Sequence, residues 1–287
     1  MNIDDCFNEN YPNVETLTIT SSYTGITTIK TIENLHTIFN ISTSTGALTK
    51  GMIPDFIKHV NIRDDYQLQI KPGILPSELI KFNMGYQYNI KLTKDCLPHN
   101  LIYLKISDAY DHEFDKDTFP PNLMYLIFPY RYTHVINTKY LPKSIKFLDF
   151  PSCVMPYGLP INVTHLYSRH GQDSKLKNLI LPPKLYLISF FDMNCDFPNN
   201  FYPKTLKVMK FTSNNGSTSY DKILNNIPST VEILIFDFLT MRLPNLPVTI
   251  KKIKIMHPHS LKRINYYFPK IPFGCKIVDE NDLIIIE

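Results

Sequence analysis

The sequence predicts a repeat solenoid of about twelve coils, each of roughly 22 residues, with one parallel β-sheet and mostly loops or short 3-10 turns on the other face. Three observations predict this fold. An apolar residue followed by proline returns at a constant spacing, apolar residues follow it at fixed offsets, and the segments between these motifs lack helical periodicity. A repeated unit of this size is typical of solenoids, in which each unit contacts only its neighbours.

The prolines set the period. Five successive units are in phase, with prolines spaced by 22 residues: Pro54, Pro76, Pro98, Pro120 and Pro142. Later units follow at steps of 18 to 25 residues, with prolines at Pro160, Pro182, Pro203, Pro228 and Pro247. Two earlier units, which begin at Tyr11 and Ile32, lack the proline at its usual place. Because proline has a fixed φ and no backbone donor, it suits the turn that leads into a strand.

Apolar residues stand three and six positions after each proline and, in all units but that of Pro160, also eight positions after it, as in Leu79, Phe82 and Met84. The last two alternate as in a β-strand, so both side chains are expected to face the core. Neighbouring strands of a parallel sheet lie about 4.8 Å apart, so successive units share one core. This periodicity predicts that equivalent residues lie side by side in one sheet: Leu104, Leu126 and Leu148.

Composition fits a globular repeat protein. The chain has 287 residues, of which 44% are hydrophobic, and this is enough apolar material for an extended core. We predict a single domain, with an N-terminal cap at residues 1–10, a solenoid at 11–268 and a C-terminal cap at 269–287. The five cysteines form no CxxC pair, and we expect them to be reduced thiols.

Charge and hydropathy bear on partners and location. The net charge of +4 is too small to predict a nucleic-acid partner by itself. The acidic N-terminus lacks the basic start and apolar run of a secretory signal. No apolar stretch approaches the roughly 20 residues that cross a bilayer. We therefore expect a cytoplasmic protein without a membrane partner.

Side chains five and seven positions after the proline should face away from the core, onto an exposed surface of the sheet. In the middle of the chain these positions are mostly aromatic or aliphatic. A monomer seldom exposes a large apolar patch that nothing covers, and tyrosine and phenylalanine are enriched at interfaces. We predict that these residues bind a protein partner: Tyr103, Lys105, Tyr125, Ile127, Phe147, Tyr167 and Leu187.

Two other interpretations of this row stay open. Aromatic and branched residues favour strands in any case, so the row can reflect β-propensity alone. The surface can also pack on a second copy of the chain, which would make a self-assembling structural protein. A strict monomer in light scattering at high concentration would rule out self-association.

Catalysis by a coil of strands, such as polysaccharide cleavage, needs acid and base groups that converge on one bond. Among the residues five and seven positions after the prolines, the one carboxylate is Asp149. We therefore predict no catalytic residues. A carbohydrate-active coil remains a lesser alternative. We also predict no cofactor and no metal. His112 and His134 stand 22 residues apart near Asp108 and Asp111, and we expect surface polar residues there rather than metal ligands.

Single-stranded nucleic acid is a further alternative, because lysines and tyrosines mix on the first half of the row. The row turns aliphatic at Leu187, Val208 and Ile233, which cannot stack on bases, so the sequence disfavours this partner. Near the C-terminus, lysines 251, 252 and 254 are expected to form a solvated basic end. A longer, protruding loop is expected at residues 214–217.

The pattern Leu-Pro-x-x-Leu-x-x-Leu-x-Phe, clearest in Leu181–Phe190 and Phe119–Phe128, resembles the FNIP repeat. This is a leucine-rich-repeat subfamily that is abundant in social amoebae and in giant viruses of amoebae. The resemblance covers about residues 11–270. It implies a leucine-rich-repeat-like fold and a non-enzymatic protein-interaction scaffold, located in the host cytoplasm if the protein is viral. An F-box often precedes such repeats, but only about ten residues precede the first unit here, so we expect none.

The chain departs from leucine-rich repeats after each strand. The asparagine or cysteine of those repeats is mostly replaced at offset eleven, where the residues are Gln87, Ala109, Arg131, Cys153, Gly171, Met193 and Asn214. Without a regular asparagine ladder the curvature of the solenoid is open, and a flatter coil is an alternative.

Overall fold

A computed structural model describes Leu17–Ile19, Thr37–Ile41 and most of the chain from residue 47 onward. The described ranges there are 47–53, 55–62, 66–151, 158–169, 179–192, 196–198, 200–213, 220–239, 241–243 and 245–286. The chain divides into two compact units, residues 1–160 and 161–287, which are taken in turn. The predicted single domain, with caps at residues 1–10 and 269–287, stays a prediction.

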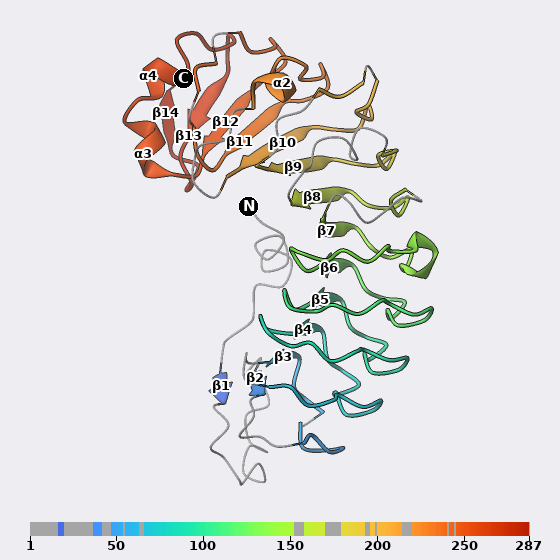
Figure 1. Cartoon of the computed structure of the whole chain (residues 1–287). Coiled ribbons are helices and arrows are strands. Elements are labelled where there is room, and N and C mark those ends of the chain that lie inside the picture. The colour runs from blue at the N-terminus through green and yellow to red at the C-terminus, as the bar shows by residue number, and fades with distance from the viewer. Residues whose placement is uncertain are drawn as a thin grey trace. The chain divides into compact units, whose positions relative to one another are not determined.

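The first unit is a succession of short parallel strands. They are β1 (Leu17–Ile19), β2 (Thr37–Ile41), β3 (His59–Ile62), β4 (Lys81–Asn83), β5 (Tyr103–Lys105), β6 (Tyr125–Ile127) and β7 (Phe147–Pro151), with the 3-10 turn η3 (Thr138–Tyr140) before β7. Each strand pairs in parallel with the next. Figure 1 shows β3 to β7 following one another along one side, with the connecting loops on the other.

The second unit repeats this arrangement and adds short helices to its loops. Its elements are β8 (His165–Arg169), β9 (Leu187–Phe191), β10 (Val208–Thr212), α2 (Asp221–Leu224), β11 (Ile233–Phe236), β12 (Lys252–Ile255), α3 (Pro258–Leu261), α4 (Ile264–Tyr267), β13 (Lys276–Val278) and β14 (Ile284–Ile286). Strands β8 to β12 pair in parallel with their successors, and β14 pairs with β13 in the antiparallel sense. The expected loops with few helical turns are therefore confirmed.

The strands lie where the prolines place them. From β3 to β12, every strand begins at the fifth residue after the proline of its unit. Within the first unit, Leu104 is in register with Leu126, and Leu126 with Leu148. The prediction that equivalent residues of successive units lie side by side is confirmed, and with it the solenoid.

The unit prolines from Pro76 to Pro142 and from Pro182 to Pro247 each begin a tight turn that leads into the strand of that unit. The carbonyl oxygen of Pro98 accepts a hydrogen bond from the amide of Leu101 at 3.1 Å, and Pro182 does the same for Leu185 at 3.1 Å. The apolar residue three positions on is thereby turned into the core, where Leu101 and Leu185 are fully buried. This turn explains why proline is tolerated at the position, because the turn uses the proline carbonyl and needs no proline N–H.

The core is a set of rows that run along each sheet. The residues three, six and eight positions after the proline are buried in both units. The residues at the sixth position form the central row of each unit, and this row is fully enclosed. In the first unit this row is Val60, Phe82, Leu104, Leu126 and Leu148. In the second unit it is Leu166, Ile188, Met209, Leu234, Ile253 and Ile277. One coil alone buries little apolar surface, so stability comes from these shared rows.

A buried tyrosine ladder holds the loop side of the first unit together. Its members recur every 22 residues and are at most 2% exposed: Tyr66, Tyr88, Tyr110 and Tyr132. The hydroxyl groups of the last three bond to the backbone of the preceding coil. The hydroxyl of Tyr88 donates to the Leu68 carbonyl at 3.3 Å, the hydroxyl of Tyr110 accepts from the Leu92 amide at 3.1 Å, and the hydroxyl of Tyr132 donates to the His112 carbonyl at 3.0 Å. The ladder thus bonds neighbouring loops to each other, which is the role expected of an asparagine ladder.

Two findings revise the C-terminal expectations. Strands β13 and β14 extend the sheet of the second unit beyond the last predicted coil. The lysines of the basic cluster also form ion pairs: the exposed Lys251 pairs with Glu232 at 2.7 Å, and Lys252 and Lys254 both pair with Asp282. These ion pairs fasten β12 to the neighbouring coil and to the turn before β14. The loop expected at residues 214–217 lies outside the described residues.

Candidate binding groove

The predicted partner-binding residues lie on the strands as expected, but most of them are buried. They occupy β5 to β9, and the six apolar side chains are between 0% and 9% exposed: Tyr103, Tyr125, Ile127, Phe147, Tyr167 and Leu187. Lys105 is half-buried. The expectation of an exposed apolar surface is therefore wrong for these six residues. Their contact with a partner stays a prediction, which now requires a rearrangement that uncovers them.

Ring stacking within the first unit explains part of this burial. Tyr103, Tyr125 and Phe147 are in register on neighbouring strands, so their rings stand in one row. The ring centroids of Tyr125 and Phe147 are 4.2 Å apart at an interplanar angle of 9°, and those of Tyr103 and Tyr125 are 6.2 Å apart. The ammonium nitrogen of Lys81 lies 4.5 Å from the Tyr103 ring centroid and continues the row. The row resembles a core layer more than a docking surface.

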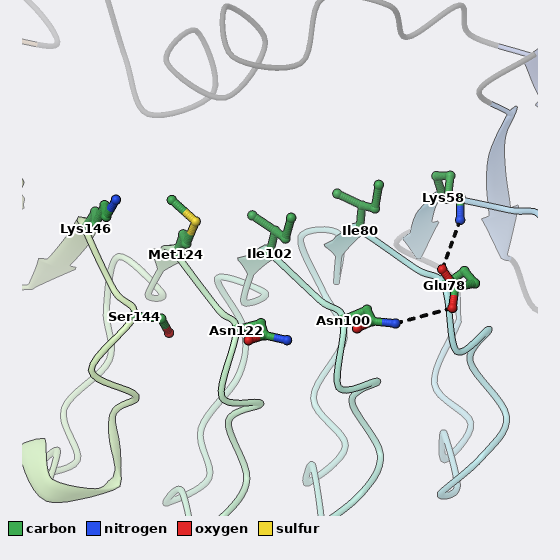
Figure 2. A pocket seen from close by; sticks show the side chains of 9 residues that line it. All are labelled: Lys58, Glu78, Ile80, Asn100, Ile102, Asn122, Met124, Ser144 and Lys146. Atoms are coloured by element: carbon green, nitrogen blue, oxygen red, sulfur yellow. Dashed lines mark hydrogen bonds and ion pairs between the residues drawn. The ribbon is translucent and has the colours of Figure 1, made fainter.

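A groove on the same unit offers accessible apolar surface. It has a volume of about 500 Å³ and spans five successive coils along the edge at which the chain enters strands β3 to β7. Its lining residues come from two repeated positions, the second and the fourth after the proline: Glu78, Asn100, Asn122 and Ser144, and Lys58, Ile80, Ile102, Met124 and Lys146. Figure 2 shows the residues of the fourth position in a row; four of the side chains point the same way, and that of Lys58 bends back towards Glu78.

The apolar floor is fixed by the backbone. In the four coils from Lys58 to Met124, the carbonyl of the residue at the fourth position accepts two amides of the following coil. The carbonyl of Ile80 accepts from Ile102 at 2.9 Å and from Tyr103 at 3.0 Å, and the carbonyl of Ile102 accepts from Met124 and Tyr125, both at 2.9 Å. This repeated bond pattern sets the half-buried side chains of Ile80, Ile102 and Met124 in line at the spacing of the coils.

The polar wall is tied to the backbone in a similar way. The side-chain nitrogen of Asn100 donates to the Ser77 carbonyl and to Glu78 Oε1, both at 3.3 Å, and that of Asn122 donates to the His99 carbonyl at 3.2 Å. The hydroxyl of Ser144 lies 2.7 Å from the carbonyls of Pro121 and of Leu123. The donors of the wall are thus used to join one coil to the next.

Charged side chains stand at both ends of the groove. At one end Lys58 pairs with Glu78 at 3.5 Å, and both side chains are partly exposed. At the other end stands the exposed Lys146. None of these groove residues was predicted as a site, although the 22-residue recurrence of an aliphatic residue directly before the strand was visible in the sequence.

The residues weighed as metal ligands have structural roles. His134 Nε2 lies 2.7 Å from Asp111 Oδ1, and His112 Nε2 lies 3.1 Å from the Asn89 carbonyl oxygen. Asp108 accepts a hydrogen bond from the Tyr130 amide at 3.1 Å. Among the residues that the structure describes, no group of three histidine, cysteine or acidic side chains could hold a metal ion.

Over the described ranges, no helix is both long and apolar enough to cross a membrane.

Comparisons with known proteins agree with the fold. The FNIP repeat family matches residues 47–87, 69–109, 88–131 and 110–153. Among solved structures, the chain is similar to CroV588, a circular leucine-rich-repeat protein, with a TM-score of 0.55 and 18% identity over 86% of this chain. The chain spans 43% of the length of that protein. No curated protein matches the chain. Residues 47–153 are therefore FNIP repeats, within a leucine-rich-repeat-like solenoid of parallel strands.

Proposed function

We propose that the chain is a non-enzymatic repeat scaffold that binds a protein partner, and that it does so through the groove of the first unit. The groove carries this proposal because its aliphatic floor is accessible and is held in place by bonds between coils. Partner sites generally combine an apolar centre with a polar rim. Ile80, Ile102 and Met124 supply the centre, and the asparagines and lysines supply the rim.

The chemistry of the groove favours binding over catalysis. Among the lining residues that the structure describes, the one carboxylate, Glu78, is paired with Lys58, and the one hydroxyl, on Ser144, lies against backbone carbonyls. General acid–base or nucleophilic catalysis needs a second reactive group within hydrogen-bond reach. The floor is aliphatic, so it lacks the rings on which bases stack. A protein segment with apolar side chains suits it better than a nucleic acid.

Replacing Ile102 with Asp tests this function. The full chain, the Ile102→Asp variant and a Val135→Asp variant would each be used to capture proteins from amoeba lysate, with quantitative mass spectrometry. Val135 is a matched control, because it is an aliphatic residue of the same unit that is 59% exposed and lies outside the groove. We expect Ile102→Asp to reduce recovery of a defined set of partners at least about tenfold, because a charge in the centre of an interface is not solvated. Equal recovery by all three proteins would reject the groove as the binding site.

A further inference from the structure

We propose that Asp282 clasps the hairpin of β13 and β14, and that breaking this clasp lets β14 swing away from the edge of β13 while the coils of the second unit stay folded. The inference is independent of the groove. It is carried by the exposure of β14, by the two ion pairs of Asp282 and by the backbone conformation of that residue.

Packing holds β14 only weakly. The exposed fractions of Leu283, Ile284 and Ile285 are 63%, 52% and 40%. On β13, by contrast, Ile277 and Val278 are 0% and 4% exposed. Because apolar stabilisation grows with the area removed from water, burial fixes β13 in the core far more firmly than it fixes β14. The pairing is also short, since β14 has three residues and the register shifts between its two partners on β13.

The carboxylate of Asp282 adds a contact that reaches across β13. Its Oδ2 lies 3.0 Å from Lys254 Nζ, and its Oδ1 contacts Lys252 Nζ. Both lysines belong to β12, which β13 separates from β14, and they stand two residues apart on one face of the strand. Hydrogen bonds from the two lysines lower the pKa of Asp282, so the carboxylate is ionised at neutral pH. The two ion pairs therefore anchor the turn to a neighbouring strand of the core.

Asp282 is also the pivot of the hairpin. Its φ is 62°, in the left-handed region that residues other than glycine seldom adopt. Within the turn, Asp279 Oδ1 accepts hydrogen bonds from the amides of Asn281 and Leu283, both at 2.9 Å. A rotation about φ of Asp282 moves Leu283 and β14 but leaves Asn281 in place. When the ion pairs break, Asp282 is free to leave the left-handed region, and β14 turns away from β13.

The position of β14 decides what this end of the sheet offers. In the closed hairpin, β14 pairs with Ile277 and Val278 and occupies their edge of β13. Once β14 opens, the backbone groups of that edge are uncovered. Uncovered edges are the places at which a sheet accepts another strand. The clasp thus controls access to the edge of β13.

Amide hydrogen exchange of the full chain, resolved by residue, tests the clasp. Asp282→Asn keeps the shape of the side chain and tolerates the left-handed conformation, but it removes the charge. We expect it to accelerate exchange from Leu283 to Ile286 at least about threefold, the scale of an exposed ion-pair network. Exchange at Asn281 and at Ile253 of β12 should stay within about twofold. Raising NaCl to about 1 M should accelerate exchange of β14 in the unaltered chain, because the screening length falls to about 3 Å, and should affect Asp282→Asn much less.

Asp117→Asn is the matched control. Asp117 is an exposed aspartate with a φ of 66° in the first unit, so its replacement should leave the exchange of β14 within about twofold. Lys254→Gln removes one of the two ion pairs from the other side and carries the test if Asp282→Asn fails to fold.

Four results would overturn the inference. Exchange of β14 that Asp282→Asn leaves unchanged, or a salt effect of equal size in both proteins, would show that the ion pairs do not hold the strand. Acceleration that extends to β11 and β12 would mean that the pairs support the whole unit. Acceleration at Asn281 as large as at Ile284 would mean that the turn melts rather than pivots at Asp282.

Discussion

Replacing Tyr125 with Asp is expected to unfold the first unit or to lower its free energy of unfolding by at least about 3 kcal/mol. Tyr125 is 1% exposed, and its ring stacks on Phe147 and Tyr103. Removing an aromatic ring from such a site leaves a cavity, and the new carboxylate loses its hydration on burial. Since small proteins are stable by only about 5–15 kcal/mol, this loss is large. Urea unfolding followed by far-ultraviolet circular dichroism measures it.

Tyr86 provides the matched control for this experiment. It belongs to the same unit and its side chain is 62% exposed, so Tyr86→Asp is expected to change stability by less than about 1 kcal/mol. If Tyr125→Asp were as stable as Tyr86→Asp, the ring row would be accessible to solvent. In that case the exposed partner surface predicted from the sequence would stand.

Raising the pH above 10 is expected to destabilise the first unit steeply through its tyrosine ladder. Burial raises the pKa of Tyr110 to about 12, and it also raises the pKa of Tyr88 and of Tyr132. In the unfolded chain a tyrosine ionises near pH 10. Between these two values the unfolded state releases the proton and the folded state does not, so stability is complete below pH 10 and falls as the pH rises towards 12. Tyr110 alone should account for about 2–3 kcal/mol.

The urea midpoint measured from pH 8 to 12 tests the ladder. Tyr110→Phe should flatten this pH dependence, while lowering stability at pH 8 by about 1 kcal/mol because the Leu92 amide loses its acceptor. Tyr266→Phe is the control, since Tyr266 is 61% exposed and lies in the second unit. A pH dependence that Tyr110→Phe leaves unchanged would assign the alkaline loss to groups outside the ladder.

The strand positions could be predicted because each coil encodes its own turn and strand. The proline turn and the paired apolar residues act within about ten residues, so a single sequence shows them. The sequence pattern does not predict strand β13, because the unit of this strand is one residue shorter. Pro272 begins its turn, and Cys275, three positions later, is buried. Ile277, five positions after Pro272, pairs with Ile253, which stands six positions after its own proline. A fixed template does not recognise such a shortened unit.

Burial of the sheet face could not be predicted in the same way. The alternation of side chains showed that Tyr103, Tyr125 and Phe147 lie opposite the central row, and this placement is correct. It did not show that their rings pack on one another, because that depends on contacts between coils. The ladder was missed for a related reason. The leucine-rich-repeat pattern places an asparagine side chain eleven positions after the proline. In this chain the bonding group is a tyrosine hydroxyl one residue later, as in Tyr88 and Tyr110.

Disulfide formation between equivalent positions of neighbouring coils tests the solenoid most directly. Asn100 and Asn122 are exposed and one coil apart, so their Cα atoms should lie about 5 Å apart, within the range that a disulfide spans. Under mild oxidation, Asn100→Cys with Asn122→Cys should form a link that peptide mass spectrometry identifies. Asn100→Cys with Ser144→Cys, two coils and about 10 Å apart, should not. No link in the first pair, or equal links in both, would contradict the stacking of coils every 22 residues.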